Sequence, residues 1–316
     1  MIANLQPPST QTIAEAAACL KAGGLVAMPT ETVYGLAANA ADPQAVARLY
    51  ETKGRPRFNP LIAHCADLGM AQQEGVLSAQ ALALAETFWP GPLTLVVDVA
   101  QSGTVCDLAR AGLDSIALRI PNHPVAQDLL RRFNAPLVAP SANPSGKISP
   151  TRAEHVAADF GDKIDLILDG GPCETGIEST IIDARGRVPV LLRPGGIAPK
   201  QIEAIWPGLT YTRQVSDAPR APGQLLRHYA TAASLRLNAA APNEGEAYLG
   251  FGSGSGSGRA DLNLSKTASL SEAAANLFSM LRTLDANHAR IAVAPIPNEG
   301  LGEAINDRLT RAAQTS

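Results

Sequence analysis

Short apolar runs alternate with amphipathic segments along about the first two hundred residues, and this alternation constrains the fold more than any other feature. Residues 24–29 (GLVAMP) are typical of a buried strand, and they follow an expected helix near residues 13–21. Asp42 and Pro43 mark the start of another helix, because Asp caps free backbone amides and Pro suits the first helical position. Strands and helices that alternate in this way predict an α/β fold with a largely internal sheet.

The same alternation predicts the other elements of this first domain. Hydrophobic residues make up 46% of the chain and charged residues 17%, which is enough apolar material to build a core. We expect further strands at residues 61–64, 93–97, 116–120, 137–139, 166–168, 180–182 and 190–192, and helices at residues 79–88, 125–133, 152–160 and 199–205.

The composition changes after Trp206, where periodicity gives way to prolines and scattered charges. Residues 207–231 are therefore predicted to link a first domain (residues 1–206) to a smaller second α/β domain (residues 232–316). Residues 252–258 alternate Gly and Ser, and a flexible surface loop is favoured there because no Gly-Lys-Ser/Thr sequence of a phosphate loop follows. The second domain is expected to have strands at 247–251 and 290–294 and helices at 270–284 and 301–313.

Charge and cysteine content narrow the functional classes. A formal net charge of −3 argues against a protein whose main work is gripping nucleic acid, although it leaves room for a local basic cavity. The four cysteines are far apart and form no C-x-x-C pair, so reduced thiols are expected rather than disulfides or structural zinc. The N-terminus has no signal-peptide pattern and no apolar run approaches the ~18 residues that span a bilayer, so we expect a soluble cytoplasmic protein.

Two short motifs suggest a phosphate-binding groove. Pro56 disfavours a helix just before it, so Lys53 and Arg55 are expected on one side of an extended segment. Ser141 and Asn143 have the same spacing and would present a hydroxyl and an amide. Two cations with neutral donors suit a polyphosphate, and Arg adds planar bidentate contacts. Taken alone, a basic pair of this kind is more often solvated surface.

Polar side chains also follow several expected strands, where open α/β sheets usually bind ligands. Thr30, Glu31 and Thr32 follow the first strand, although a turn capped by the threonines explains them equally well. His64 closes an apolar run, and a satisfied structural histidine is the more common reading of such a position. Arg119 lies on one face of an expected strand, where it is well placed to clamp a carboxylate.

The chain lacks the common nucleophile and nucleotide motifs. It has no Walker loop, no nucleophile elbow, no H-E-x-x-H sequence and no G-x-G-x-x-G after the first strand. Residues 139–146, 176–180 and 192–196 instead add hydroxyls, amides and cations at proline- or glycine-flanked strand edges. This pattern indicates catalysis by positioning and charge stabilisation, as in nucleotidyl or phosphoryl transfer.

Nine collinear segments resemble the longer, two-domain form of the threonylcarbamoyl-AMP synthase family, the YrdC-like proteins. The likeness covers nearly the whole chain, in order and with plausible spacing. The segments are PTETVYGLAANA (29–40), KGRPRFNPLIAH (53–64), WPGPLTLVV (89–97), SIALRIPNHP (115–124), APSANPSGKISPT (139–151), GIESTIID (176–183), LLRPGGI (191–197), RHYA (227–230) and PIPNEGLGEAINDRL (295–309).

The resemblance implies a fold and a reaction. A twisted open sheet would form a positively charged cavity, and a long linker would join it to a smaller Rossmann-like domain. The enzyme, a nucleotidyltransferase, would convert ATP, L-threonine and bicarbonate to L-threonylcarbamoyladenylate and pyrophosphate, with Mg²⁺ accompanying ATP. This is the first step of the N6-threonylcarbamoyladenosine modification of tRNA. The product would pass to the tRNA threonylcarbamoyl-transfer machinery, with at most a weak contact to tRNA and no membrane partner.

The resemblance also implies site residues by motif, and it implies no metal-binding residue. Arg119 would take the threonine carboxylate, and a carbamate formed on the threonine amine would attack the α-phosphorus of ATP. The catalytic group would be Lys53, Arg55, Ser141 and Asn143. The L-threonine site would be Thr32, His64, Arg119, Ala139 and Ser179. The ATP site would be Arg55, Asn59, Ser115, Ser141, Ser149, Arg193 and Tyr229.

Two departures from the family and two alternatives stand beside this interpretation. The C-terminal domain is rather short and carries the Gly/Ser loop, and the linker differs at one position. The linker has Thr231 after His228-Tyr229-Ala230, where the family commonly has Pro, which bears on how the linker closes. An RNA-binding or ribosome-assembly module is one alternative, but the net charge and the lack of an aromatic-basic stripe count against it. A relative that uses carbamoyl phosphate is the other, and the second domain argues against it.

Overall fold

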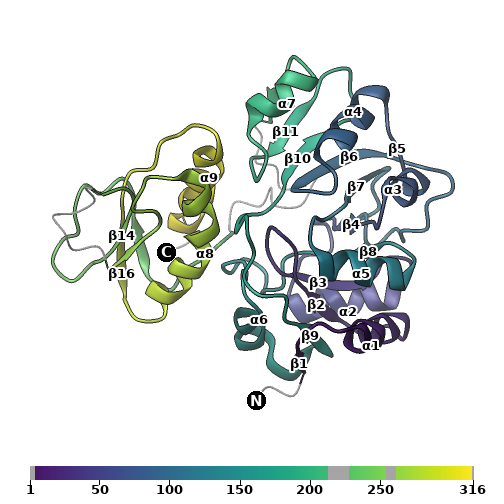
Figure 1. Cartoon of the computed structure of the whole chain (residues 1–316), viewed down its shortest axis with the longest axis horizontal. Coiled ribbons are helices and arrows are strands. Elements are labelled where there is room, and N and C mark those ends of the chain that lie inside the picture. The colour runs from purple at the N-terminus through teal and green to yellow at the C-terminus, as the bar shows by residue number, and fades with distance from the viewer. Residues whose placement is uncertain (1–3, 213–227, 254–260, 315–316) are drawn as a thin grey trace.

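Figure 1 shows the computed structural model of the chain, which describes residues 4–212, 228–253 and 261–314. Two β-sheets divide these residues. The N-terminal unit (residues 4–212) contains a twelve-stranded sheet, and the C-terminal unit (residues 232–253 and 261–314) contains a four-stranded sheet. The predicted α/β class, with a large sheet followed by a smaller one, is confirmed.

The element bounds follow the alternation seen in the sequence. Within the described ranges, no helix is both long and apolar enough to cross a membrane. The helices are α1 (Thr10–Lys21), α2 (Pro43–Lys53), α3 (Leu68–Glu74), α4 (Ala79–Phe88), α5 (Pro124–Phe133), α6 (Ala153–Phe160), α7 (Pro199–Ile205), α8 (Leu270–Asp285) and α9 (Leu301–Ala313). The strands are β1 (Leu5–Gln6), β2 (Val26–Met28), β3 (Gly35–Asn39), β4 (Ile62–His64), β5 (Gly75–Val76), β6 (Leu93–Val99), β7 (Ser115–Arg119), β8 (Leu137–Val138), β9 (Leu166–Leu168), β10 (Thr180–Asp183), β11 (Val190–Arg193), β12 (Thr210–Tyr211), β13 (Ser234–Arg236), β14 (Ala247–Gly250), β15 (Leu262–Asn263) and β16 (Arg290–Val293).

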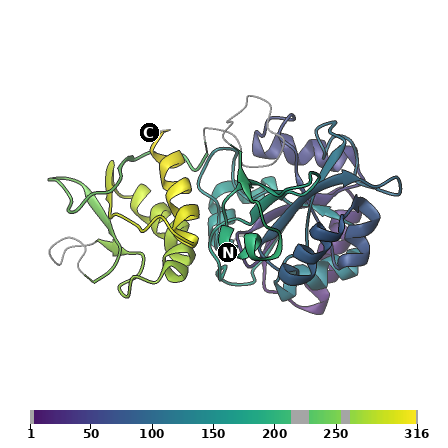
Figure 2. The same ribbon diagram turned by 90° about the horizontal axis from the view of Figure 1, so that it is seen from above.

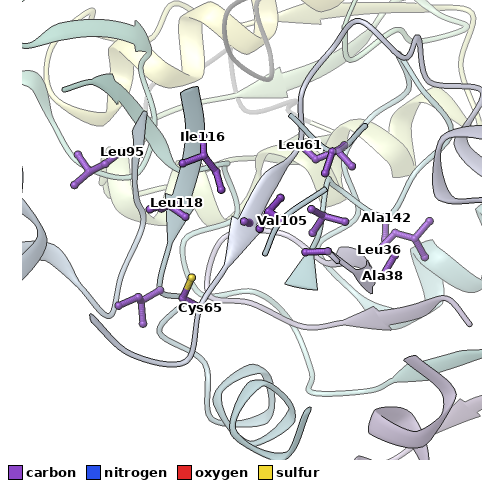
Figure 3. Packing of buried hydrophobic residues seen from close by; sticks show 14 of the residues in the cluster. Leu36, Ala38, Leu61, Cys65, Leu95, Val105, Ile116, Leu118 and Ala142 are labelled. Atoms are coloured by element: carbon purple, nitrogen blue, oxygen red, sulfur yellow. The ribbon is translucent and has the colours of Figure 1, made fainter. Parts of the chain in front are cut away.

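Helices cover both faces of the large sheet near its centre. Val26 and Met28 of β2 belong to an apolar cluster with α1 and α5, whereas Ala27 belongs to the larger cluster with α2. Successive strand residues face opposite sides, so a strand covered on both sides becomes a continuous apolar run. Figure 3 shows part of the larger cluster, which extends from Leu95 of β6, beside Leu118 of β7, to Leu36 of β3, beside Ala142.

The register of the large sheet gathers the ends of several strands. The parallel pair β4 and β7 places His64 opposite Arg119. The antiparallel pair β10 and β11 places Ile181 opposite Arg193, and β10 runs parallel to β6. Because β6 is antiparallel to β7, the starts of β6 and β10 lie beside the end of β7. The end of β11 pairs with the start of β10, so these termini and the end of β4 lie on the same side of the sheet.

Several short elements of this unit were not expected from the sequence, among them β1, β3, β5, β12 and α3. Residues 35–39 (GLAAN) have a composition that is poor for strands, yet they form β3 because they pair with β2 and β8. The short helix α3 lacks an apolar stripe and follows its N-cap Asp67, whose carboxylate accepts from the Met70 amide at 2.8 Å. Pairing and capping therefore override the weak local pattern in both places.

The C-terminal unit is a parallel sheet with two helices on one face. Its strand order is β13-β16-β14-β15, and all three pairings are parallel. Helices α8 and α9 lie between this sheet and the N-terminal unit, as Figures 1 and 2 show. Their apolar cluster includes Val33, Ile148 and Ile177 of the N-terminal unit, so the two units share a core.

The predicted linker is described only at its ends. Residues 210–211 form β12, which pairs in parallel with β11 and extends the large sheet. At the other end, the Ala230 amide donates to the Gly146 carbonyl oxygen at 2.7 Å. Residues 213–227 of the linker and residues 254–258 of the predicted Gly/Ser loop lie outside the described residues.

Tyr34 provides a test of the buried hydrogen bonds in this fold. Its hydroxyl donates to the Gly171 carbonyl oxygen at 2.8 Å and accepts from the Gly170 amide at 3.1 Å. We predict that Tyr34→Phe lowers the free energy of unfolding by about 1–3 kcal/mol, because both backbone groups lose a partner. The matched change Tyr211→Phe, on a ring that is 57% exposed, should alter it by less than about 0.5 kcal/mol. Chemical denaturation measures both, and equal losses would contradict the prediction.

Candidate active site

A small cavity lies at the gathered strand ends. Its volume is about 50 Å³, whereas pockets for small molecules usually measure roughly 300–1,000 Å³. Side chains therefore fill most of the space between its walls. The lining residues are Thr32, Val33, Arg55, Leu61, Ile62, His64, Arg119, Ala139, Pro140, Ser141, Glu178, Ser179, Arg193 and His228.

Arg119 is held in place by an acidic partner. Its Nη2 lies 2.8 Å from Oε1 of Glu31, and both side chains are almost fully buried. Its Nε donates to the Gly91 carbonyl oxygen at 3.3 Å, while Glu31 Oε2 accepts from the Asn122 amide at 3.0 Å. A buried charge needs such a partner to offset its loss of water. Sequence analysis noted both residues but not that they pair.

His64 is a neutral imidazole in this setting. The residue is 2% exposed, and its Nδ1 lies 3.2 Å from the Ile62 carbonyl oxygen. Burial, with help from the positive charge of Arg119, lowers the pKa of His64 to about 3. His64 therefore offers hydrogen bonds but no charge at neutral pH.

Hydroxyl groups form the wall beside the cations. Thr32 Oγ1 lies 2.9 Å from Thr30 Oγ1, and Ser179 Oγ lies 2.7 Å from Thr94 Oγ1. Arg193 donates to the Ser179 carbonyl oxygen through Nε at 3.1 Å and through Nη2 at 2.9 Å. Burial lowers the pKa of Arg193 to about 10, so it remains a cation at neutral pH.

The extended segment predicted for Lys53 and Arg55 is wrong. Lys53 is the last residue of α2, and Gly54 ends that helix in the left-handed conformation (φ 60°). Lys53 Nζ donates to the carbonyl oxygens of Ser141 and Asn143. Lys53 is 3% exposed. Burial is the main cause that lowers its pKa well below the usual range, and the positive charge of Arg55 lowers it further. Lys53 therefore fastens the 141–143 loop and does not line the cavity.

Asn143 also serves its own loop. Its Nδ2 donates to the carbonyl oxygens of Pro144 and Lys147, each at 2.9 Å. Arg55 and Ser141, the other halves of the two motifs, do line the cavity. Each predicted pair thus divides into one residue that faces the cavity and one that supports the loop.

Backbone oxygens hold Arg55. Its Nε donates to the Asn59 carbonyl oxygen at 3.3 Å and its Nη2 to that of Pro60 at 2.9 Å. The Tyr50 hydroxyl donates to the same Asn59 oxygen at 2.9 Å. Burial lowers the pKa of Arg55 to about 10, which still leaves it protonated at neutral pH. The Asn59 side chain does not line the cavity, but its carbonyl fixes the cation that does.

Ser115 lies at the opposite end of β7 from Arg119. Both are on the same strand face, as predicted, and Ala117 between them belongs to a buried apolar cluster with Val96 and Ile181. Four residues of strand separate Ser115 from Arg119 by roughly 13 Å. Ser115 does not line the small cavity, and an apolar floor leads from the cavity toward it.

The C-terminal unit reaches the cavity wall through Glu178. The Glu178 Oε1 atom accepts from Ser149 Oγ at 2.6 Å, and Oε2 accepts from Arg308 Nε at 3.0 Å. Although burial alone would raise it, the charges of Arg308 and Arg193 lower the pKa of Glu178 to about 2. Neither Glu178 nor Arg308 was singled out as a site residue, because an acidic and a basic residue 130 positions apart carry no local signal.

The end of the linker closes the same wall. His228 lines the cavity, and burial lowers its pKa to about 3. The Tyr229 ring is 1% exposed and stacks on Phe278 of α8, with ring centroids 5.3 Å apart. The Arg308 guanidinium carbon lies 5.6 Å from the centre of the Tyr229 ring. Ser149 and Tyr229 therefore stand behind the lining residues rather than among them.

The described residues contain no group of three or more His, Cys, Asp or Glu side chains arranged to hold a metal ion. The carboxylate that lines the cavity, Glu178, already has two partners.

Comparisons with known proteins agree with this geometry. A Sua5–YciO–YrdC family model, described as "Telomere recombination", matches residues 18–195. A second, described as "Threonylcarbamoyl-AMP synthase, C-terminal domain", matches residues 197–314.

Similar proteins come from bacteria and archaea. A threonylcarbamoyl-AMP synthase of Bacillus subtilis is 41% identical over 95% of this chain and 92% of its own length. One from Pyrococcus abyssi is 42% identical over 94% of this chain and 93% of its own length. The crystal structure of P. abyssi Sua5 complexed with L-threonine superposes with a TM-score of 0.89 at 39% identity, covering 99% of this chain and 97% of that one. Both sequence and fold therefore match along nearly the full length, and this chain belongs to the threonylcarbamoyl-AMP synthase family.

Proposed function

We propose that this chain makes L-threonylcarbamoyladenylate from L-threonine, bicarbonate and ATP, with release of pyrophosphate. The observation that carries the proposal is the cavity itself, which Arg119 and the neutral His64 line together with two more cations, Arg55 and Arg193. An amino-acid carboxylate and a polyphosphate are the anions that such paired cationic positions suit. The shared name of the relatives, and the L-threonine held by P. abyssi Sua5, support the same substrates.

The threonine subsite would be built around Arg119. Its guanidinium would bind the carboxylate, and Glu31 would keep it from turning away. The uncharged His64 ring suits the hydroxyl or amine, because a cation there would repel an ammonium group. The remaining members of this subsite would be Thr32, Ala139 and Ser179, which line the cavity.

The nucleotide would extend from the cavity across the sheet. Arg55, Ser141 and Arg193 would face its phosphates, and the apolar floor around Ala117 would receive the base, with Ser115 beyond it. Asn59 would act by holding Arg55, as Lys53 and Asn143 would by holding the Ser141 loop. Mg²⁺ would enter bound to ATP as part of the substrate. A cavity of about 50 Å³ means that His228 at the linker end would move to admit ATP.

The reaction needs no protein nucleophile. The threonine amine and bicarbonate would condense to a carbamate with loss of water. A carbamate oxygen would then attack the α-phosphorus, the bond to the bridging oxygen would break, and pyrophosphate would leave with the electron pair. Arg55 and Arg193 would stabilise the charge that develops on the phosphates. The protein's contribution would be orientation and fixed positive charge.

The domain assignment follows the two sheets. The catalytic domain would span residues 1–206, the linker 207–231 and a Rossmann-like domain 232–316, since the two sheets divide between β12 and β13. The enzyme would act in the cytoplasm as the first step of N6-threonylcarbamoyladenosine formation. Its product would pass to the proteins that modify tRNA.

A pyrophosphate-release assay tests the proposed function directly. We predict release when the protein receives MgATP, bicarbonate and L-threonine, and none when threonine is omitted, because the carbamate is the attacking group. Release that continues at the same rate without threonine would contradict the proposal. Tight, salt-sensitive tRNA binding without turnover would instead favour an RNA-binding module.

Arg55→Ala tests the nucleotide subsite. Loss of one charge-assisted contact, worth about 1.5–3 kcal/mol, should weaken ATP binding roughly 10- to 150-fold. Arg57→Ala is the matched control, because Arg57 is an exposed arginine of the same loop. Calorimetric titration with a non-hydrolysable ATP analogue measures both, and an unchanged affinity in Arg55→Ala would remove that residue from the site.

A further inference from the structure

Arg308 is the one side chain of α9 in the described structure that reaches the cavity wall through a charged contact. Its side chain is 0% exposed, although arginine is almost never fully buried without a partner. Nε donates to Glu178, and Nη1 donates to the Pro194 carbonyl oxygen at 2.7 Å and to Asp307 at 2.9 Å. Two of these three partners belong to the N-terminal unit, so the guanidinium bridges the two units.

The bridge continues to a residue proposed for the ATP site. Glu178 holds Arg308 with one carboxylate oxygen and accepts from the Ser149 hydroxyl with the other, at 2.6 Å. An ionised carboxylate only accepts hydrogen bonds, and a serine hydroxyl has a single proton. Ser149 therefore donates its only hydroxyl proton to Glu178, and only the lone pairs of its oxygen remain for a ligand.

Charge and packing both depend on Arg308. Its positive charge is the largest influence that opposes the effect of burial on the pKa of Glu178, and so it keeps that carboxylate ionised. The guanidinium also lies over the ring of the linker residue Tyr229, which stacks on Phe278 of α8 in the same unit as Arg308. A protonated Glu178 would become a donor itself and would no longer fix the direction of the Ser149 proton.

We infer that Arg308 is a positioning residue for the nucleotide: through Glu178 it orients Ser149 as a hydrogen-bond acceptor, and it packs against Tyr229 at the same time. Ser149 stands behind the lining residues here, and the ligand group that it would receive once ATP is admitted is accordingly a donor, a ribose hydroxyl or the adenine amino group, and not a phosphate oxygen. This inference deepens the proposed function and rests on it for its kinetic readout. It also gives the second unit a role in the site, beyond packing.

If Arg308 only joined the two units, its loss would affect the binding of both substrates alike, whereas a positioning role predicts a larger effect on ATP than on threonine. A second ion pair, Arg282 with Asp159, also joins the two units, and Asp159 touches neither Glu178 nor the cavity. Asp159→Asn is therefore the matched control for loss of an ion pair between the units. Arg308→Lys keeps the charge but not the forked geometry, and it serves as a milder second variant if Arg308→Met folds poorly.

Steady-state kinetics separate the two roles. For Arg308→Met we expect KM for ATP to rise about tenfold or more while KM for threonine changes less than about twofold, with partial recovery in Arg308→Lys and near wild-type values in Asp159→Asn. Combining Arg308→Met with Ser149→Ala should cost little more than either change alone, because both break one chain of contacts. Equal rises in both KM values, or additive losses in the double variant, would overturn the inference.

Nucleotide analogues test the direction of the Ser149 contact. Ser149→Ala should weaken binding of ATP. The analogues 2′-deoxy-ATP, 3′-deoxy-ATP and purine riboside triphosphate lack the 2′-hydroxyl, the 3′-hydroxyl and the adenine amino group, respectively. The substitution should have little effect on binding of the one analogue that lacks the group donating to Ser149. An equal loss with ATP and all three analogues would overturn the assigned polarity. Binding is titrated without threonine or turnover, so a wild-type chain that binds nucleotide but releases no pyrophosphate counts against the proposed function alone.

Discussion

Five basic side chains lie at or near the cavity, four of them buried and Arg55 partly buried, and the structure around the cavity depends on how each is compensated. Backbone carbonyl oxygens provide most of the partners, together with three carboxylates. Lys53 binds the 141–143 loop, Arg55 the 59–60 segment and Arg193 the strand start at Ser179. Arg119 combines one carbonyl with Glu31, and Arg308 combines one carbonyl with Glu178 and Asp307. A buried charge without partners costs several kcal/mol, so each cation also determines the path of the chain that pairs with it.

This arrangement explains why the loops of the site are well placed although they lack regular structure. Loops rarely hold functional groups firmly unless a rigid frame or internal hydrogen bonds fix them. Here Lys53, Arg119 and Arg193 hold the loops by hydrogen bonds from the protein interior, because each stands at the end of a helix or strand that the core fixes. The ends of β4 and β7 are fixed in a similar way, since the register of the two strands places His64 beside Arg119.

Much of the fold was predictable from apolar periodicity, and the failures have identifiable physical causes. The helices at residues 79–88, 199–205 and 301–313 were predicted with the bounds that the structure shows, because their patterns are strong and their starts are marked. β3 was missed because its residues become a strand only by pairing with distant neighbours. Lys53 was misplaced because Pro56 restricts only the residue before it, whereas Gly54 is the usual signal that a helix continues to its preceding residue.

The candidate site shows the same division between local and distant information. Motif resemblance pointed to Thr32, His64, Arg119 and Ser179, and all four line the cavity. Their supporting partners could not be read from a single sequence, because Glu31 and Glu178 acquire their roles only through contacts with residues far along the chain. A charged residue on an amphipathic helix, such as Arg308, has the sequence signature of an ordinary solvated face.

The buried position of Arg308 has a thermodynamic consequence for the molecule as a whole. Its contacts with Glu178 and Pro194 exist only while the two units are docked, so docking and a correctly formed nucleotide wall are linked equilibria. Linkage is reciprocal: if docking strengthens nucleotide binding by some factor, the nucleotide must stabilise docking by that same factor. The second unit would then respond to the nucleotide state of a site to which it contributes no lining residue.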